Sequence, residues 1–268
     1  MSIFDQKVIK YEMKPLSSLE KVFPDETPVY RMECQMLSGL WGETVSFQVA
    51  YTGDFVMRER LDVRVVSELA EHVHVRTVEM VPVGRATNGI VDDNYLKTIS
   101  GLYPDLLKDL KDGKVIVYSR QWRSLWVDVD ITNEIPAGEY EIELQLIKEG
   151  EVVCSAKQKV TVIGTELPKL DIMHTEWMHA DCLADYYHVE VFSEEHWKLL
   201  ENYFQEYVKR DCNMMLTPLF TSPLDTAIGL ERTTCQLIDV EVKDGEYVFG
   251  FEKLKRWIDL CKKCGIEY

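Results

Sequence analysis

Short alternating segments, which run from residue 8 to residue 162, constrain the fold of this chain more than any other feature. They are rich in Val, Ile, Thr and aromatic residues and are separated by clusters of Gly, Pro, Asp and Asn. Successive side chains of a β-strand point to opposite faces, so this alternation predicts strands with one buried face. We expect strands over residues 44–52, 61–66, 72–83, 115–118, 125–131, 140–147 and 152–163.

Turn residues between these segments indicate how the strands pair. Glu149-Gly150 is a tight reversal, so residues 140–163 are predicted to form a hairpin. Many short strands over a region of this length are typical of two antiparallel sheets packed face to face. We therefore predict that residues 1–165 form an N-terminal antiparallel β-sandwich, interrupted by one helix near residues 93–112.

The pattern changes after Gly164, and Pro168 marks the expected boundary between two domains. Residues 170–177 and 213–220 are apolar enough for strands buried on both faces, and residues 266–268 would begin a third. Ser193 is a predicted N-cap, and an amphipathic helix follows each of the first two strands. Alternating strands and helices are typical of (β/α) barrels. Residues 166–268 are therefore predicted to be the first βα units of a truncated (β/α)8 barrel catalytic domain, incomplete because two and a fraction units cannot close a barrel.

About thirty residues connect the second expected strand to its helix, where two to six are usual. Asp244-Gly245 lies between two alternating segments, so this connection is predicted to carry its own β-hairpin. In a barrel, such a connection lies at the end of the strands where active sites are assembled.

The charge of the chain excludes some partners. Asp and Glu outnumber Lys and Arg by 46 to 30, which gives a net charge of -16. This charge repels phosphate groups, so neither nucleic acid nor an anionic membrane surface is an expected partner. No apolar run approaches the ~20 residues that span a bilayer, and the first residues do not resemble a signal peptide. We expect a soluble, cytoplasmic protein, whose oligomeric state the sequence does not specify.

The chain offers few candidates for metals or cofactors. Its glycines form no nucleotide-binding motif. Its seven cysteines are an odd number, typical of reduced thiols. Cys261 and Cys264 share one helix face but would supply only half of a zinc site, so we expect buried thiols without a metal or redox role. His72 and His74 are predicted to share one strand face with Arg76, and a solvated face is favoured over a metal site because no third ligand is apparent. We expect no cofactor and no metal.

The densest group of reactive side chains follows the first expected barrel strand and contains Trp177, His179 and Asp181. An exposed indole beside polar groups is suited to a sugar, because the ring stacks on the C–H face while polar groups bind hydroxyls. The alternative is that Trp177 plugs the barrel mouth. Glu176 or Asp181 would supply one carboxyl group for glycoside hydrolysis, but no pair is identified. A nucleophilic couple of Cys182 and His179 is a further, less favoured alternative.

A second cluster lies in the long connection and comprises Asp225, Thr226, Glu231 and Arg232. Each residue of the adjacent pair Glu231 and Arg232 would either anchor the connection or reach a ligand. Arg232 presents a planar fork that matches a carboxylate, so we expect a pair that orders this loop.

Several motifs resemble a known family. They comprise residues 101–107 (GLYPDLL), 126–129 (WVDV) and 136–140 (PAGEY) in the first domain, and 176–182 (EWMHADC), 193–197 (SEEHW), 216–221 (LTPLFT) and 224–226 (LDT) in the second. With these motifs the chain resembles bacterial glycoside-hydrolase-like proteins related to the β-N-acetylgalactosaminidases, that is, glycoside hydrolase family 123. The likeness covers nearly the whole chain.

This resemblance implies a carbohydrate substrate and hydrolysis of a β-linked 2-acetamido sugar, with the substrate's own N-acetyl oxygen as nucleophile. An adjacent Asp-Glu pair on a later barrel strand would act, with Glu as general acid. That pair has no matching positions here, so no catalytic residue is expected in this chain, which would be inactive alone. The alternative is a non-catalytic carbohydrate-binding or structural β-sandwich module. The residues that the resemblance places around the sugar are Trp177, His179 and Asp181, with Asp225, Thr226, Glu231 and Arg232 at the rim.

Overall fold

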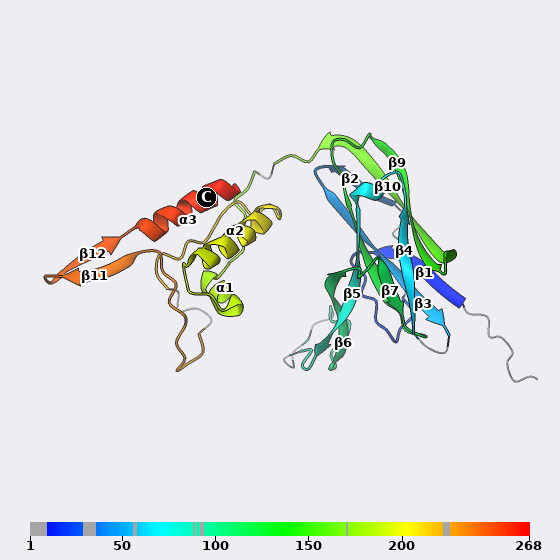
Figure 1. The fold of residues 1–268 in the computed structure, drawn as a ribbon, viewed down its shortest axis with the longest axis horizontal. Helices are drawn as coiled ribbons and strands as arrows, with labels where there is room; N and C mark the ends of the chain where they lie inside the picture. The colour runs from blue at the N-terminus through cyan, green and yellow to red at the C-terminus, as the bar shows by residue number, and fades with distance from the viewer. Residues whose placement is uncertain are drawn as a thin grey trace, which may run out of the picture. The chain divides into compact units, whose positions relative to one another are not determined.

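The computed structural model describes residues 10–28, 36–55, 58–87, 89, 91, 94–169, 171–221 and 226–268. The chain divides into two compact units, Met1–Pro168 and Lys169–Tyr268. The first unit is built almost entirely from strands, and the second combines helices with a two-stranded ribbon (Figure 1). Each unit has its own buried apolar cluster.

The first unit contains two five-stranded sheets. One sheet has the order β1 (Lys10–Ser17), β3 (Thr44–Asp54), β8 (Arg123–Asp130), β5 (Val73–Val83) and β6 (Gly101–Asp109). The other has the order β2 (Met36–Trp41), β10 (Glu151–Glu166), β9 (Gly138–Lys148), β4 (Glu59–Val66) and β7 (Lys114–Val117). Strands β6 and β7 are each the edge strand of one sheet. They are consecutive along the chain and are joined by a short turn.

Alternating apolar side chains hold the two sheets together. Phe47 and Val127 from one sheet and Leu144 and Val160 from the other are fully buried in a single cluster. Burying side chains of this size stabilises a fold by roughly 1.5–3 kcal/mol each relative to exposure. The predicted sandwich is therefore present, and its core is formed between the sheets.

The predicted hairpin over residues 140–163 is confirmed. Strands β9 and β10 pair in antiparallel fashion, and the two turn residues have positive φ angles, 53° at Glu149 and 88° at Gly150. Positive φ at both central residues is the geometry of the hairpin turn that matches the twist of the flanking strands. Local turn chemistry therefore fixes this part of the sheet.

The helix expected near residues 93–112 is wrong: residues 101–109 form strand β6, which pairs with β5. Asp92 and Asp93 lie outside the described residues. The Leu-rich segment has helix-forming residues, but pairing along the edge of the sheet overrides this preference. Pro104 is tolerated because β6 is an edge strand, and the register shifts beside it.

Other details of the first unit also differ from expectation. The sandwich is not purely antiparallel, because β2 pairs in parallel with β10 at the sheet edge. Strands β1 and β2 were not among the predicted segments. His72 lies in a short 3-10 helix, η1 (Ala70–His72), rather than on the strand face with His74. Arg76 pairs with the carboxylate of Asp128 on this face, and the His74 ring lies 3.2 Å from the carboxylate of Asp130.

The second unit contains α1 (Ala180–Tyr187), α2 (Glu194–Val208) and α3 (Glu252–Cys264), with β11 (Asp239–Lys243) and β12 (Glu246–Gly250). Ser193 caps α2, since its hydroxyl accepts a hydrogen bond from the His196 N–H. Gly265 ends α3 with a φ of 97°. Both predicted helices are therefore confirmed, as is the ribbon at Asp244-Gly245, where β11 pairs with β12. Helix α1 was not predicted.

Helices α2 and α3 pack against each other. The rings of Phe204 and Trp257 meet edge to face at 5.0 Å between centroids, and both side chains are buried. At the surface of the same contact, Arg256 pairs with Glu194 through two hydrogen bonds of 2.7 and 2.8 Å. Aromatic burial dominates this contact, because exposed ion pairs contribute little to stability.

The three strands expected in this unit are not formed as strands. Residues 171–177, 213–220 and 266–268 are extended but are joined only by isolated hydrogen bonds. Asn213 provides most of these: its side chain bonds to Ile172 and His174 at 2.8 Å each, and its carbonyl accepts from the Glu267 N–H at 2.9 Å. Ile172 is 65% exposed, so the expected burial on both faces is absent in this unit.

None of the helices in the described ranges has both the length and the apolar character needed to cross a bilayer.

Candidate functional site

A hollow of about 320 Å³ lies where the first extended segment of the second unit meets α1. Three stretches of chain line it: residues 177–181, residues 216–221 and the end of the long connection at Arg232 and Cys235. Residues 177–181 and 216–221 come a few positions after His174 and Asn213, which are joined by hydrogen bonds. Side chains at the ends of neighbouring segments therefore meet at one edge.

A buried ion pair forms one wall of the hollow. The Arg232 Nε and Nη2 groups donate hydrogen bonds of 2.6 and 2.9 Å to the two carboxylate oxygens of Asp181. Their side chains are only 12% and 8% exposed. The Thr233 hydroxyl also donates to the Asp185 carboxylate at 2.8 Å. The long connection is thus attached to α1 at two points, in the manner that the fork of Arg232 predicts.

The buried side chain of His196 fixes the position of α1. Its ring is fully buried, Nδ1 accepts from the Phe192 N–H at 2.9 Å, and Nε2 lies 2.9 Å from the Ala180 carbonyl. Because Nδ1 accepts, the neutral ring carries its proton on Nε2 and donates it to Ala180. Burial lowers the pKa of His196 below its ordinary value, which keeps the ring neutral. Helix α2 thereby holds the residue next to Asp181.

Tyr207 joins the two extended segments on the other side. Its hydroxyl accepts a hydrogen bond from the Glu176 N–H at 2.7 Å and donates to the Met214 carbonyl at 2.7 Å. One side chain of α2 therefore satisfies backbone groups of both segments just before they reach the hollow. This contact sets their relative position where no sheet ladder does.

The mouth of the hollow is apolar and open. Trp177 is 66% exposed and Phe220 is 55% exposed, and both line the hollow. Trp177 is therefore not a buried plug in the described part of the chain. An exposed indole beside a fixed polar wall leaves one ring face available for a ligand.

Comparison with known proteins relates the second unit to a family of glycoside hydrolases. The model of the glycoside hydrolase 123 catalytic domain matches residues 177–268, the region that contains the hollow. The second unit, over these residues, is thus similar to the catalytic domain of glycoside hydrolase family 123. A family 123 glycoside hydrolase from Clostridium perfringens, studied for glycolipid glycan hydrolysis, has the same fold over 97% of this chain, with a TM-score of 0.70 and 15% sequence identity.

This chain spans 46% of the length of the Clostridium perfringens family 123 structure. A β-glucosidase from Listeria innocua is also similar in part, with 10% identity over 60% of this chain and 17% of its own, at a TM-score of only 0.27. No curated protein sequence matches the chain.

Within the glycoside hydrolase 123-like region, the structure brings together four of the residues selected from sequence. Trp177, His179, Asp181 and Arg232 all line the hollow. Thr226 and Glu231 do not line it; Glu231 is exposed, whereas the Thr226 hydroxyl is buried without a hydrogen-bond partner among the described residues. Asp225 lies outside the described residues.

Sequence reasoning missed the apolar side of this glycoside hydrolase 123-like site. The sequence indicates only a strand and a family motif for LTPLFT, residues 216–221. Its position at the end of the second expected strand is the available signal, because the strands of a barrel end at the same edge. The additional residues that line the hollow are Leu216, Thr217, Pro218, Phe220, Thr221 and Cys235.

Buried thiols do not supply a nucleophile here. Burial raises the pKa of Cys235 to about 12 and that of Cys261 to about 12, so both stay protonated at neutral pH. Burial also raises the pKa of Cys264, which packs with Cys261 in the apolar cluster of the second unit. Among the residues with described positions, no three His, Cys, Asp or Glu side chains are grouped to hold a metal ion.

Proposed function

We propose that residues 169–268 are the first βα units of a (β/α)8 barrel belonging to a glycoside hydrolase that acts on β-linked sugars. Asn213 lies between the Ile172–His174 segment and Glu267, which is the spatial order of three successive barrel strands. Helices α2 and α3 connect these segments along the chain. Strands of a complete barrel receive partners on both sides, which would extend these isolated hydrogen bonds into ladders.

One observation carries the proposal: an exposed Trp177 beside the buried Asp181–Arg232 pair, at the end of the first segment of a family 123 region. We propose that the indole stacks on a sugar ring while His179 and the carboxylate–guanidinium wall bind its hydroxyls. Asp225, Thr226 and Glu231 would belong to the rim, as the family resemblance implies.

The proposed substrate is a β-linked 2-acetamido sugar that is cleaved with help from its own N-acetyl oxygen. This chemistry uses an adjacent Asp and Glu, and the chain contains that dipeptide only once, at Asp25-Glu26. Both of these side chains pair with Lys97 in the first unit, at 3.3 and 2.8 Å. We therefore propose that this chain contributes a sugar-binding part of the site and does not by itself catalyse hydrolysis.

The decisive test uses a protein that continues this chain to the length of its family 123 relatives. Chromogenic β-linked 2-acetamido sugars, other β-glycosides and a glycolipid glycan would be assayed in parallel. We expect turnover of the 2-acetamido sugars and none by the 268-residue chain. Turnover only of other β-glycosides would contradict the proposed substrate. A folded long protein that binds sugar but cleaves none would favour a carbohydrate-binding module.

A further inference from the structure

The first unit contains a second and larger hollow. It measures about 770 Å³ and is lined by residues of β4 and β7 from one sheet and of β5 and β6 from the other. Its volume is in the range of sites that enclose small organic ligands. We call this hollow the sandwich cleft.

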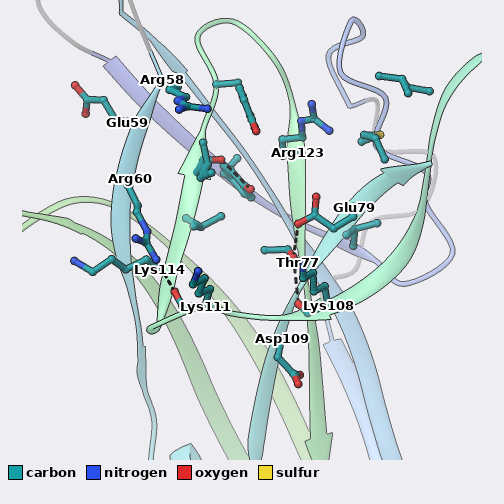
Figure 2. Close-up of a pocket in the computed structure, with 17 residues that line it drawn as sticks. Arg58, Glu59, Arg60, Thr77, Glu79, Lys108, Asp109, Lys111, Lys114 and Arg123 are labelled. Atoms are coloured by element: carbon teal, nitrogen blue, oxygen red, sulfur yellow. Dashed lines mark hydrogen bonds between the residues drawn. The ribbon is translucent and has the colours of Figure 1, made fainter. Parts of the chain in front are cut away.

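The side chains of the sandwich cleft are cationic although the chain as a whole carries a charge of -16. Six Lys and Arg residues line the cleft, against three carboxylates. Figure 2 shows Arg60, Lys111 and Lys114 grouped on one side and Thr77, Glu79 and Lys108 on the other. A local excess of positive charge in a concave site attracts anions strongly, because low-dielectric walls focus the field.

Much of this positive charge is not neutralised by the protein. Arg60 and Lys114 pair with Asp112 and Asp62, at 2.9 and 3.0 Å. Lys108 and Lys111, in contrast, form no side-chain ion pair with any described residue. These two lysines are therefore free to bind an anionic group of a ligand.

Arg123 also lines the cleft. Its guanidinium lies 4.9 Å from the centre of the Tyr118 ring, and one Nη donates to the Gln121 side chain at 3.1 Å. Its Nε is buried and has no hydrogen-bond partner among the described residues. Because this Nε has almost no exposed surface, a ligand does not reach it, and Arg123 contributes its positive charge to the cleft without this donor.

The carboxylates in the cleft restrict the type of anion. Glu59 is already bound by Tyr11 and Lys148, whereas Glu79 and Asp109 are the other two carboxylates that line the cleft. Glu79 accepts one hydrogen bond of 2.8 Å, from the Thr77 hydroxyl, and the Asp109 carboxylate points away from Thr77, Glu79 and Lys108 in Figure 2. Both carboxylates would repel a polyanion with phosphates along its whole length, yet a carboxylate such as that of Glu79 is a good acceptor for hydroxyl groups. Leu102 and Ile116 are partly exposed and add an apolar surface. A ligand with one anionic group, several hydroxyls and an apolar C–H face satisfies all three features.

We propose that the sandwich cleft binds an acidic saccharide, one that carries a carboxylate or a sulfate group. The anionic group binds Lys108 or Lys111, the lysines without an ion-pair partner among the described residues, and the hydroxyls of the sugar donate to Glu79. This site belongs to the first unit and uses none of the residues of the Trp177 hollow, so the proposal stands independently of the hydrolase function.

The test is calorimetric titration of the 268-residue chain with lactose, sulfated lactose, sialylated lactose and inorganic sulfate. We expect the two acidic sugars to bind at least about tenfold more tightly than lactose, as charge-assisted hydrogen bonds require. The ratio between the two shows whether sulfate or carboxylate is preferred. Equal binding of lactose would overturn the proposal, and so would binding of free sulfate as tight as that of sulfated lactose, which would indicate an adventitious ion only.

Charge reversal locates the site. Lys108→Glu combined with Lys111→Glu is expected to weaken binding of the acidic sugars by at least about tenfold. The matched control combines Lys159→Glu with Lys255→Glu, which changes the net charge equally at exposed positions that do not line the cleft. The control should bind as the unmodified chain does. An equal loss of affinity in both double variants would mean that binding depends only on the net charge of the chain, and would refute a specific site. Circular dichroism and the melting temperature verify that each variant is folded.

Discussion

The guanidinium of Arg232 holds the carboxylate of Asp181 with two hydrogen bonds, of 2.6 and 2.9 Å, across 51 positions of sequence. This pair closes the long connection onto α1 and forms the polar wall of the Trp177 hollow. Removing one partner leaves the other charge buried and unpaired, which costs more than the pair itself contributes.

We predict that Arg232→Met lowers the unfolding free energy of the second unit by about 3–5 kcal/mol. The measurement is hydrogen exchange of the α1 and α2 amides, with urea unfolding as a second readout. Arg256→Met is the matched control, because Arg256 makes the same two-bond contact with Glu194 at exposed positions. Arg256→Met should lower the unfolding free energy by about 1 kcal/mol or less. Equal losses would show that the Asp181–Arg232 pair is not effectively buried.

His196 should give the second unit a pH-dependent stability. Burial lowers its pKa in the folded state, whereas the unfolded chain has a pKa of about 6.5. Below pH ~6.5 the unfolded state therefore binds a proton that the folded state does not, and the unfolding free energy falls as the pH falls. The stabilisation is fully present above pH ~6.5 and is lost toward the lowered pKa, by up to about 1.4 kcal/mol per pH unit.

Urea unfolding at several pH values between about 7.5 and 5 tests this dependence. His196→Gln retains a donor and an acceptor but does not titrate, so its stability should change less over this range. His188→Asn serves as the control, since His188 is exposed and has a positive φ that Asn tolerates. If the control flattened the profile as much as His196→Gln, the titrating group would not be His196.

The cap of α2 contributes measurably to the second unit. Ser193→Ala removes the hydroxyl that accepts from the His196 N–H at 3.2 Å, and we expect a loss of about 1 kcal/mol in unfolding free energy. Ser193→Asp keeps an acceptor at the helix N-terminus and should restore most of the loss. A Ser193→Asp variant as unstable as Ser193→Ala would show that the cap does not act through this hydrogen bond.

Trp177 is expected to act on ligand binding and not on folding. Trp177→Ala in the long protein should weaken sugar binding by about 1–3 kcal/mol, the range for stacked aromatic rings. Its effect on unfolding should stay within about 0.5 kcal/mol, because the side chain is 66% exposed. Tyr247→Ala, at an aromatic residue that is 70% exposed and outside the hollow, should leave binding unchanged. Isothermal titration calorimetry of both variants decides between stacking and a merely exposed ring.

Local features were predictable from the sequence because their causes lie within a few residues. Glu149-Gly150 and Asp244-Gly245 adopt the positive φ angles of tight turns, and both hairpins follow from them. Ser193 is the N-cap of α2, because its hydroxyl accepts a hydrogen bond from the His196 N–H in the first turn. The motif at residues 176–182 also indicates the family whose catalytic-domain model matches residues 177–268, and it contains the exposed Trp177 and the buried Asp181.

Tertiary structure decided what depends on distant partners. Residues 101–109 have helix-forming side chains but become strand β6, because the free edge of β5 supplies hydrogen bonds. Residues 171–177 have the composition of a strand buried on both faces, but no ladder forms there and Ile172 stays exposed, since such burial requires elements that cover both faces. Likewise, only the folded structure shows that Asp181 is the partner of Arg232 and that the Lys and Arg residues of the sandwich cleft lie close together. Periodicity and turn chemistry act through adjacent residues, whereas burial, ion pairing and the edges of sheets depend on segments that the chain brings together only when it folds.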